Sequence, residues 1–347
     1  MKRSLFLMFV LAACGDNGGS GTDAGGDVDA SGSGSDSGID SPPQADCAYS
    51  EMRDVDNDTT EDGTAEATNV TLSSRTVLCG KVEHTHFIPD ITVDGDAYHV
   101  TAPVEMDVVV RITGDLTGIE LAGVDVYPGP SFQTLAGGNV YYGDHGVGIA
   151  HLPAGPSEIL VLALNTQAIT ATRDYRIEIT EDQPALRCPE VTTGGYTEAN
   201  DGNANTGNDV FTFPQAGTIA LTASTTDAAE AAGAMPARIA GSIADTTVDA
   251  QYKDRDAYTF TTGATTNEIT IRLTWPVTPA ANLDFMLFEG TSVMPETRVV
   301  KNNTSGTELL VYSIKPNTTY TLLVAGKSAT TFPVAYNATL CGGTFVP

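Results

Sequence analysis

Short apolar segments recur along most of the chain, and clusters of Gly, Pro, Asn, Asp or Thr separate them. Within the segments, apolar residues either alternate with polar ones or follow one another without a break, and β-branched and aromatic residues predominate. This pattern is typical of a sandwich or barrel built from short β-strands. Only residues 227–234 (DAAEAAGA) have a helical composition, and Gly233 and Pro236 would end such a helix early.

One segment occurs twice, which indicates an internal repeat. Residues 94–100 (DGDAYHV) reappear as residues 254–260 (DRDAYTF), with the shared frame D-x-D-A-Y-x-apolar. A glycine precedes each copy, Gly80 in the first and Gly241 in the second. Two further matches follow in the same order, VDVY at 124–127 with LDFM at 283–286, and the turn LPAG at 152–155 with IKPN at 314–317. The repeat predicts two homologous all-β domains in tandem.

The start of the chain carries an export signal. Two basic residues precede a short apolar stretch at 5–10, and LAAC at 11–14 ends in Cys14. The stretch is too short to span a bilayer, so a cleaved signal over residues 1–13 is favoured over a membrane span. LAAC resembles the lipobox of bacterial lipoproteins, in which the cysteine is acylated and anchors the mature protein. We expect a lipidated Cys14; the alternative is a simple secretory signal whose cysteine is incidental.

The composition after the signal predicts a tether. Residues 14–46 are mostly Gly, Ser, Asp, Ala and Thr, so they cannot bury enough apolar surface to offset the entropy of ordering. We expect this segment to be disordered, and its aspartates are too irregularly spaced for a calcium-binding repeat. Two β-sandwich, jelly-roll-like domains are then predicted at 47–182 and 188–347, with a linker at 183–187.

The charge balance restricts the partners. The chain has 44 acidic and 17 basic side chains, a formal net charge of -27. Nucleic acid is excluded as a partner, because phosphate contacts need clustered Lys and Arg. Direct adhesion to anionic lipid headgroups is disfavoured for the same reason. The acidic excess indicates either a solvated surface or affinity for calcium.

Four cysteines remain once Cys14 is assigned to lipid. An even number of cysteines in an exported protein indicates two disulfides, and three pairings are possible. The predicted domain boundary favours bridges that each close a loop within one domain. Those bridges are Cys47 with Cys79 and Cys188 with Cys341.

Motifs of known catalytic chemistry do not occur in the mature sequence. It contains no G-x-S-x-G, H-E-x-x-H or S-x-x-K, and no phosphate-binding glycine loop. His84 and His86 would share one face of a strand, as a Zn or Cu pair does, but no third ligand is evident. We therefore interpret both as exposed histidines and predict that the protein is not an enzyme.

Taken together, these motifs resemble the bacterial pre-peptidase C-terminal domain family, which includes the collagen-binding domains of bacterial collagenases. The family pattern has an acidic stretch ending near Asn-Asp, a glycine before a strand, D-x-D-x-Y-x-F, L-x-P-G-x-Y and a last Tyr-containing strand. In the second domain the matches are EAND at 198–201, Gly241, residues 254–260 and Tyr336. In the first domain they are DND at 56–58, Gly80, residues 94–100, LPAG at 152–155 and Tyr175. The sequence departs from the pattern at KPN (315–317), where Pro-Gly is usual, and in an insertion at about 203–235.

The resemblance implies calcium as the one cofactor. In the collagen-binding relatives, the acidic stretch and the D-x-D strand supply oxygen ligands, which Ca²⁺ prefers. Residue by residue, the candidate ligands are Glu198, Asn200, Asp201 and Asp254 in the second domain, and Asp56, Asp58 and Asp94 in the first. The alternative is that these aspartates cap turns and bond neighbouring amides, as Asp often does.

The function predicted from these observations is that of a non-catalytic lipoprotein anchored in the bacterial cell envelope, at the outer membrane or cell surface. Its tandem domains would bind an extracellular polysaccharide or protein, as similar domains appended to secreted proteases do. Exposed aromatic side chains are the expected contacts, and the densest cluster is Tyr127, Phe132, Tyr141 and Tyr142. The alternative is that most of these aromatic residues belong to the core. The alternative is an envelope spacer protein without a specific ligand.

Overall fold

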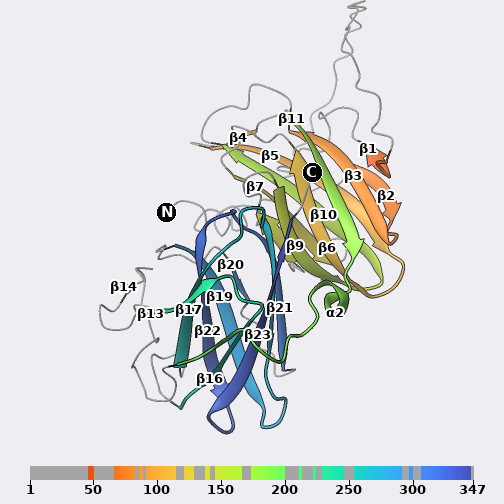
Figure 1. Cartoon of the computed structure of the whole chain (residues 1–347). Helices are drawn as coiled ribbons and strands as arrows, with labels where there is room; N and C mark the ends of the chain where they lie inside the picture. The colour runs from red at the N-terminus through yellow and green to blue at the C-terminus, as the bar shows by residue number, and fades with distance from the viewer. Residues whose placement is uncertain are drawn as a thin grey trace, which may run out of the picture.

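β-Strands make up nearly all the regular structure of the described part of the chain (Figure 1). The computed structural model describes residues 46–50, 66–82, 86–88, 91–114, 121–128, 137–140, 145–165, 173–199, 211–212, 222–223, 229–245, 254–290, 297–299 and 306–344. One group of strands ends with β11 (Arg173–Glu181) and a second begins with β12 (Tyr196–Thr197). The predicted class, all-β with two tandem domains, is confirmed.

In the first group, eleven described strands form one sheet. They are β1 (Tyr49–Ser50), β2 (Glu66–Thr71), β3 (Arg75–Val82), β4 (His86–Ile88), β5 (Ile91–Ala102), β6 (Met106–Gly114), β7 (Leu121–Pro128), β8 (Gly137–Val140), β9 (His145–Leu152), β10 (Gly155–Asn165) and β11. Their order is β1-β3-β11-β6-β9-β8-β7-β10-β5-β2, and β4 pairs with β5 beside this path.

In the second group, the described strands form two five-stranded sheets and a two-stranded one. The strands are β12, β13 (Phe211–Thr212), β14 (Thr222–Ala223), β15 (Glu230–Ala234), β16 (Arg238–Ile243), β17 (Asp254–Thr261), β18 (Glu268–Thr274), β19 (Ala281–Glu289), β20 (Thr297–Val299), β21 (Thr307–Ser313), β22 (Thr319–Ala329) and β23 (Val334–Gly343). The larger sheets have the orders β12-β16-β23-β18-β21 and β15-β17-β22-β19-β20, and β13 pairs with β14.

The two groups share one strand order. β1-β3-β11-β6-β9 corresponds to β12-β16-β23-β18-β21, and β2-β5-β10-β7-β8 corresponds to β15-β17-β22-β19-β20. In the first domain, the pairing of Gly137 with Ala150 links β8 to β9 and joins the two layers into one sheet. The sequence repeat is therefore a repeat of the whole topology.

Cross-strand register refines the alignment of the repeats. The paired residues run Tyr98, Ile159, Val126 in the first domain and Tyr258, Leu322, Leu287 in the second. The predicted match of residues 124–127 with 283–286 is therefore displaced by two positions. Asp125 occupies the place of Met286, not that of Asp284. A shift of two residues keeps every side chain on the same face of its strand.

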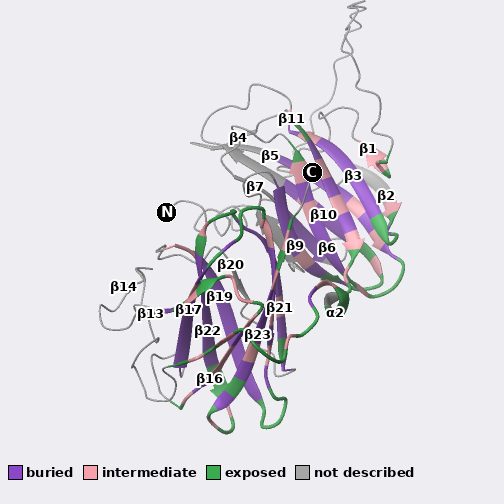
Figure 2. Cartoon of the chain, viewed as in Figure 1, coloured by how far each residue is buried: buried purple, intermediate pink, exposed green. Residues whose placement is uncertain are grey.

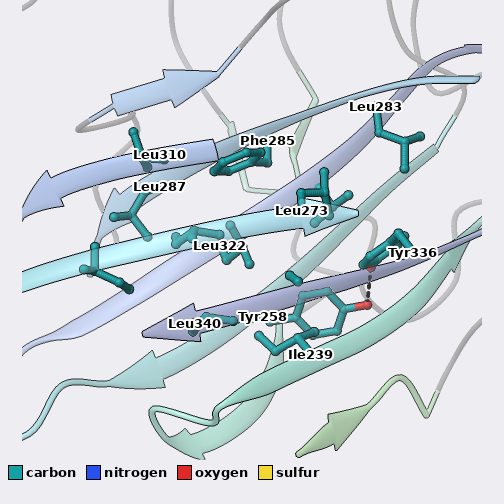
Figure 3. Packing of buried hydrophobic residues seen from close by; sticks show 14 of the residues in the cluster. Ile239, Tyr258, Leu273, Leu283, Phe285, Leu287, Leu310, Leu322, Tyr336 and Leu340 are labelled. Carbon is teal, nitrogen blue, oxygen red and sulfur yellow. Dashed lines mark hydrogen bonds between the residues drawn. The ribbon is translucent and has the colours of Figure 1, made fainter. Parts of the chain in front are cut away.

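Each domain encloses its own apolar core between two layers of strands (Figure 2). Alternate residues of β17 and β19 point inward, and Tyr258, Leu283, Phe285 and Leu287 meet Leu273 of the facing sheet (Figure 3). The described residues of β19 from Ala281 to Phe288 are buried on both faces of the strand, so this sheet is covered on its outer side as well.

Two disulfides lie within the domains. Cys47 is bonded to Cys79 and Cys188 to Cys341, with Cα separations of 6.0 and 5.7 Å. Of the three possible pairings, this is the one that the predicted domain boundary favours. The first bridge ties the residues before β1 to β3, and the second ties the entry of the second domain to its last strand.

Helix occurs at one described place, and it differs from the prediction. Residues 184–187, within the predicted linker, form α2 (Pro184–Arg187). Residues 230–234, which were expected to be helical in composition, form β15 instead, because they pair in parallel with β17. The pairing with a buried strand outweighs the helical preference of alanine. Within the described residues, we find no helix with the length and apolar character needed to cross a membrane.

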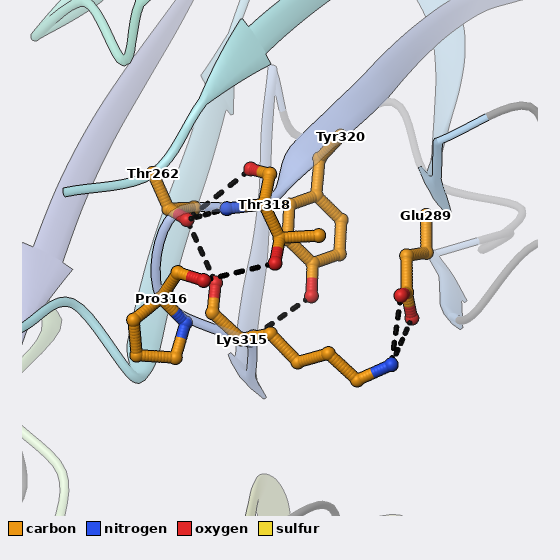
Figure 4. A network of polar contacts seen from close by, with 6 residues as sticks. All are labelled: Thr262, Glu289, Lys315, Pro316, Thr318 and Tyr320. Carbon is orange, nitrogen blue, oxygen red and sulfur yellow. Dashed lines mark hydrogen bonds and ion pairs between the residues drawn. The ribbon is translucent and has the colours of Figure 1, made fainter. Parts of the chain in front are cut away.

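The turn KPN at 315–317 reproduces the turn of the first domain without a glycine. Asn317 has a φ of 50° and Gly155 a φ of 114°, both positive. Asn is one of the few residues that tolerate the left-handed region. The Thr262 hydroxyl donates a hydrogen bond to the carbonyl of Lys315 (2.7 Å) and holds the turn (Figure 4).

Candidate functional site

The repeated D-x-D-A-Y strand places two carboxylates and a phenol on one face of β17. Asp254, Asp256 and Tyr258 are alternate residues, so all three point into the sandwich. The hydroxyl of Tyr336, from β23, lies 2.5 Å from that of Tyr258 (Figure 3). It donates a hydrogen bond to Asp256 (2.7 Å). A buried Tyr-Tyr-Asp group thus closes one end of the core.

A glycine makes room for this group. Gly241, on β16, pairs with Tyr336 across the sheet, and a Cβ atom there would lie 2.6 Å from the Tyr258 hydroxyl. It would overlap the Tyr336 hydroxyl as well. The glycine that precedes the repeated motif is therefore required by the close approach of two phenol groups to the strand.

Two further carboxylates lie around this end of the second domain. Glu198 accepts a hydrogen bond from the amide of Ser242 (2.9 Å), and Asp254 accepts one from the amide of Ala244. Glu230, on β15, accepts hydrogen bonds from the Tyr196 hydroxyl (2.6 Å) and from the amide of residue 199. The last residues of β16 and those just after it thus bring Glu198 and Asp254 together.

The carboxylates and phenols affect one another's protonation. Burial raises the pKa of Asp256 well above its usual value, and the charges of Glu198 and Asp254 raise it further. Burial likewise raises the pKa values of Tyr258 and Tyr336, so both phenols stay neutral. The hydrogen bond to Glu230 raises the pKa of Tyr196 to about 12. The site is thus a concentration of acidic oxygen atoms with neutral hydroxyl donors.

The structure brings together two of the seven predicted calcium ligands. Glu198 and Asp254 lie at the same end of the second domain, whereas Asn200 and Asp201 lie outside the described residues. Within the described part, no set of three His, Cys, Asp or Glu side chains is placed to hold a metal ion. The donor type suits Ca²⁺, and the full calcium ligand set stays a prediction.

The first domain has the same Tyr-Tyr-Asp group. Tyr98 and Tyr175 are hydrogen-bonded to each other, Tyr175 donates to Asp96, and Gly80 lies against both hydroxyls. The predicted ligands Asp56 and Asp58 lie outside the described residues, as does the side chain of Asp94. Cys14 also lies outside them.

Two acidic positions were missed by the sequence reasoning. Glu230 pairs with Tyr258 across the sheet just as Glu66 pairs with Tyr98. The second missed position is Asp256, the middle carboxylate of the motif, which was not among the candidate ligands. The sequence did contain a signal for Glu230, because the dipeptide Glu-Ala begins β2 as well as β15.

The predicted aromatic contact cluster is not supported at Tyr127. This side chain is 1% exposed, and its hydroxyl donates to Asp125 (3.3 Å), so the prediction that it is an exposed contact is wrong. Phe132, Tyr141 and Tyr142 lie outside the described residues. The outer face of the β7 sheet is covered, which the local sequence did not reveal.

The histidines with described side chains face carboxylates. His99 Nδ1 lies 3.4 Å from Glu158, His151 Nδ1 lies 2.8 Å from Asp107, and the buried His145 lies 3.3 Å from Glu268. His84 and the side chain of His86 are outside the described residues.

An open hollow of about 480 Å³ lies beside Trp275, at the end of β18. Its one acidic side chain, Glu190, accepts a hydrogen bond from the Thr274 hydroxyl (2.9 Å). The lining contains Tyr336 but neither His, Cys nor Lys.

No protein-family model and no curated protein matches the chain. Among solved structures, it is similar to the pre-peptidase C-terminal domain of a collagenase from Bacillus anthracis, with a TM-score of 0.26 and 16% identity over 34% of this chain and 99% of that domain. It is also similar to PliG of Aeromonas hydrophila, a periplasmic inhibitor of g-type lysozyme, with a TM-score of 0.23 and 14% identity over 33% of this chain and 96% of the inhibitor. The first belongs to the family that the sequence motifs resemble.

Proposed function

We propose that the chain is a non-catalytic lipoprotein of the bacterial cell envelope whose tandem β domains bind an extracellular polysaccharide or protein, with calcium at the acidic end of the second domain. The observation that carries this proposal is the convergence of Glu198 and Asp254 on the end of β16, beside the buried Asp256. Carboxylates that are held close together at a domain end repel one another, and a divalent cation relieves that repulsion.

Export is supported by the two disulfides, because such bonds persist in oxidising compartments. The anchor is proposed at Cys14, on the resemblance of residues 11–14 to a lipobox. The tether after it would separate the domains from the membrane surface and leave their binding faces accessible.

Calcium binding is tested by thermal unfolding of the full chain in millimolar calcium against chelator. Calcium should raise the melting temperature of the wild type, because binding to the native state stabilises it by mass action. Glu198→Gln should lose most of this shift. Its amide oxygen can still accept from Ser242, so the melting temperature without metal should change little.

Glu289→Gln is the matched control, since Glu289 is a carboxylate of the same domain that pairs with Lys315 (2.7 Å) away from the site. This variant should keep the full calcium shift. A wild-type melting temperature that is equal in calcium and in chelator would remove calcium from the proposal.

The binding role is tested separately. The full chain should be retained by collagen, a polysaccharide or an envelope fraction in a co-sedimentation screen, with and without calcium. Retention by none of these would favour the alternative of a spacer protein without a ligand. Retention that is equal with and without calcium would show that ligand binding does not need calcium.

A further inference from the structure

The two domains contact each other through the outer faces of two strand pairs. Val109 from β6 and Val147 and Ile149 from β9 pack with Val311 from β21 in one buried apolar cluster. These residues alternate with the core residues of their own strands, so they point away from their own sandwich. Apolar side chains on an outer strand face are thereby removed from water by the other domain.

A charged group lies beside this apolar cluster. Glu268, at the start of β18, accepts two hydrogen bonds from the Arg111 guanidinium, at 2.8 and 3.1 Å. The Nε2 atom of His145 lies 3.3 Å from the same carboxylate. The exposed fractions of the three side chains are 17% for Arg111, 12% for Glu268 and 1% for His145. A bidentate pair with this little exposure is directional and poorly screened by salt.

The contacting strands are equivalent in the two repeats. β6 and β9 of the first domain correspond to β18 and β21 of the second. By register, Glu268 corresponds to Asp107, which instead pairs with the exposed His151 of its own domain. Each domain thus contacts the other through the same strand pair, as subunits do in an isologous dimer. The symmetry is broken at one position, because Glu268 is largely buried between the domains and Asp107 is not.

The connection between the domains reinforces the contact. The amide of Asp182 donates to the carbonyl of Asp107 (2.8 Å), and Arg187 donates to both carboxylate oxygens of Asp182 (2.7 Å each). Cys188, the next residue, is bonded to Cys341. The chain that joins the domains is therefore fixed at both of its ends.

We infer that the two domains form one unit of fixed orientation, locked by Glu268 between Arg111 and His145. Glu268 belongs to the second domain, whereas Arg111 and His145 belong to the first. Loss of Arg111 or of His145 therefore destabilises the folded second domain. The unit would hold the acidic end of the second domain in a constant orientation relative to the first domain. This inference does not depend on calcium.

The chain contains a natural reporter for the second domain. Trp275 is the one tryptophan of the sequence, and it is buried in the core of that domain. Its fluorescence during thermal unfolding of the full chain follows the second domain alone. A substitution in the first domain that shifts this transition must act across the interface.

Arg111→Met is the test substitution. It leaves Glu268 without its bidentate donor. The melting temperature followed by Trp275 fluorescence should therefore fall by about 5 °C or more. Arg75→Met is the matched control: Arg75 also lies on a strand of the first domain, but it pairs with a glutamate of its own domain, Glu178 (2.7 Å), and is 49% exposed. The control should leave the tryptophan transition at the wild-type temperature.

Equal tryptophan transitions for Arg111→Met and Arg75→Met would overturn the inference. If Arg111→Met does not fold, Arg111→Lys is measured in the same way, because it keeps the charge but loses the two-pronged donor geometry. Small-angle X-ray scattering of the full chain provides the second readout: wild-type data should show one fixed separation of the domains. A distribution of separations in the wild type would also refute the lock.

Discussion

Replacement of Gly241 by alanine tests the close approach of the two phenol groups to β16. The new Cβ atom would lie 2.6 Å from the Tyr258 hydroxyl, whereas ordinary contacts begin at 3.4 Å, so the ring would have to withdraw by about 0.8 Å. It would overlap the Tyr336 hydroxyl too, and both rings are closely packed. Overpacking of a closed core costs about 1–3 kcal/mol.

For a domain of this size, such a cost lowers the melting temperature by about 2–12 °C. The assay is tryptophan fluorescence, since Trp275 lies in the affected core. Gly343→Ala is the matched control, because its Cβ atom would meet Glu268 at 3.6 Å, an ordinary contact. The control should therefore unfold within about 1 °C of the wild type.

Tyr336→Phe provides a second test of the same close contact. Tyr336→Phe alone should cost about 1–3 kcal/mol, because Asp256 loses a buried donor. Combined with Gly241→Ala it should cost less than the sum of the two, by at least about 0.5 kcal/mol, since the closest oxygen has been removed. Strictly additive costs, or a Gly241→Ala midpoint equal to that of Gly343→Ala, would refute this account of the glycine.

Two further predictions concern the first domain and the anchor. Burial raises the pKa of Asp125 to about 6, so its contribution to stability is complete below its unfolded value near 3.8 and is lost as the pH rises through 6. Asp125→Asn should therefore match the wild type at pH 4 and exceed it at pH 8 by up to about 3 kcal/mol in the free energy of unfolding, measured by far-UV circular dichroism in urea; an equal difference at both pH values would contradict this shift. Cys14→Ala should leave the protein unlipidated and move it from the membrane to the soluble fraction, and unchanged mass and fractionation would reject the lipobox.

Local patterns predicted the class and the repeat because they depend on alternation along single strands. The frame D-x-D-A-Y located Asp254, and the acidic stretch located Glu198, before any tertiary contact was known. The displaced match of residues 124–127 shows the limit of such patterns. Side chains of a strand point alternately inward and outward, so an alignment that is wrong by two residues still matches inward with inward positions. The hydrophobic pattern therefore does not reveal the error.

Other features depend on contacts between distant segments. Residues 230–234 form a strand because β17 lies beside them, which their alanine-rich composition does not indicate. Tyr127 is buried on the outward-facing side of its strand, since the outer face of its sheet is covered. The Arg111–Glu268 pair joins residues 157 positions apart, and no local spacing predicts which domain faces will meet.

The register of the repeats shows where the two copies have diverged. On the inner faces, tyrosine, glycine and aspartate hold equivalent places in both domains. On the outer faces, Asp125 and Tyr127 stand where the second domain has Met286 and Phe288. The two copies are thus chemically distinct modules on one scaffold. Because these outer residues are buried as well, their exchange between the domains would have to be matched by the residues that cover them.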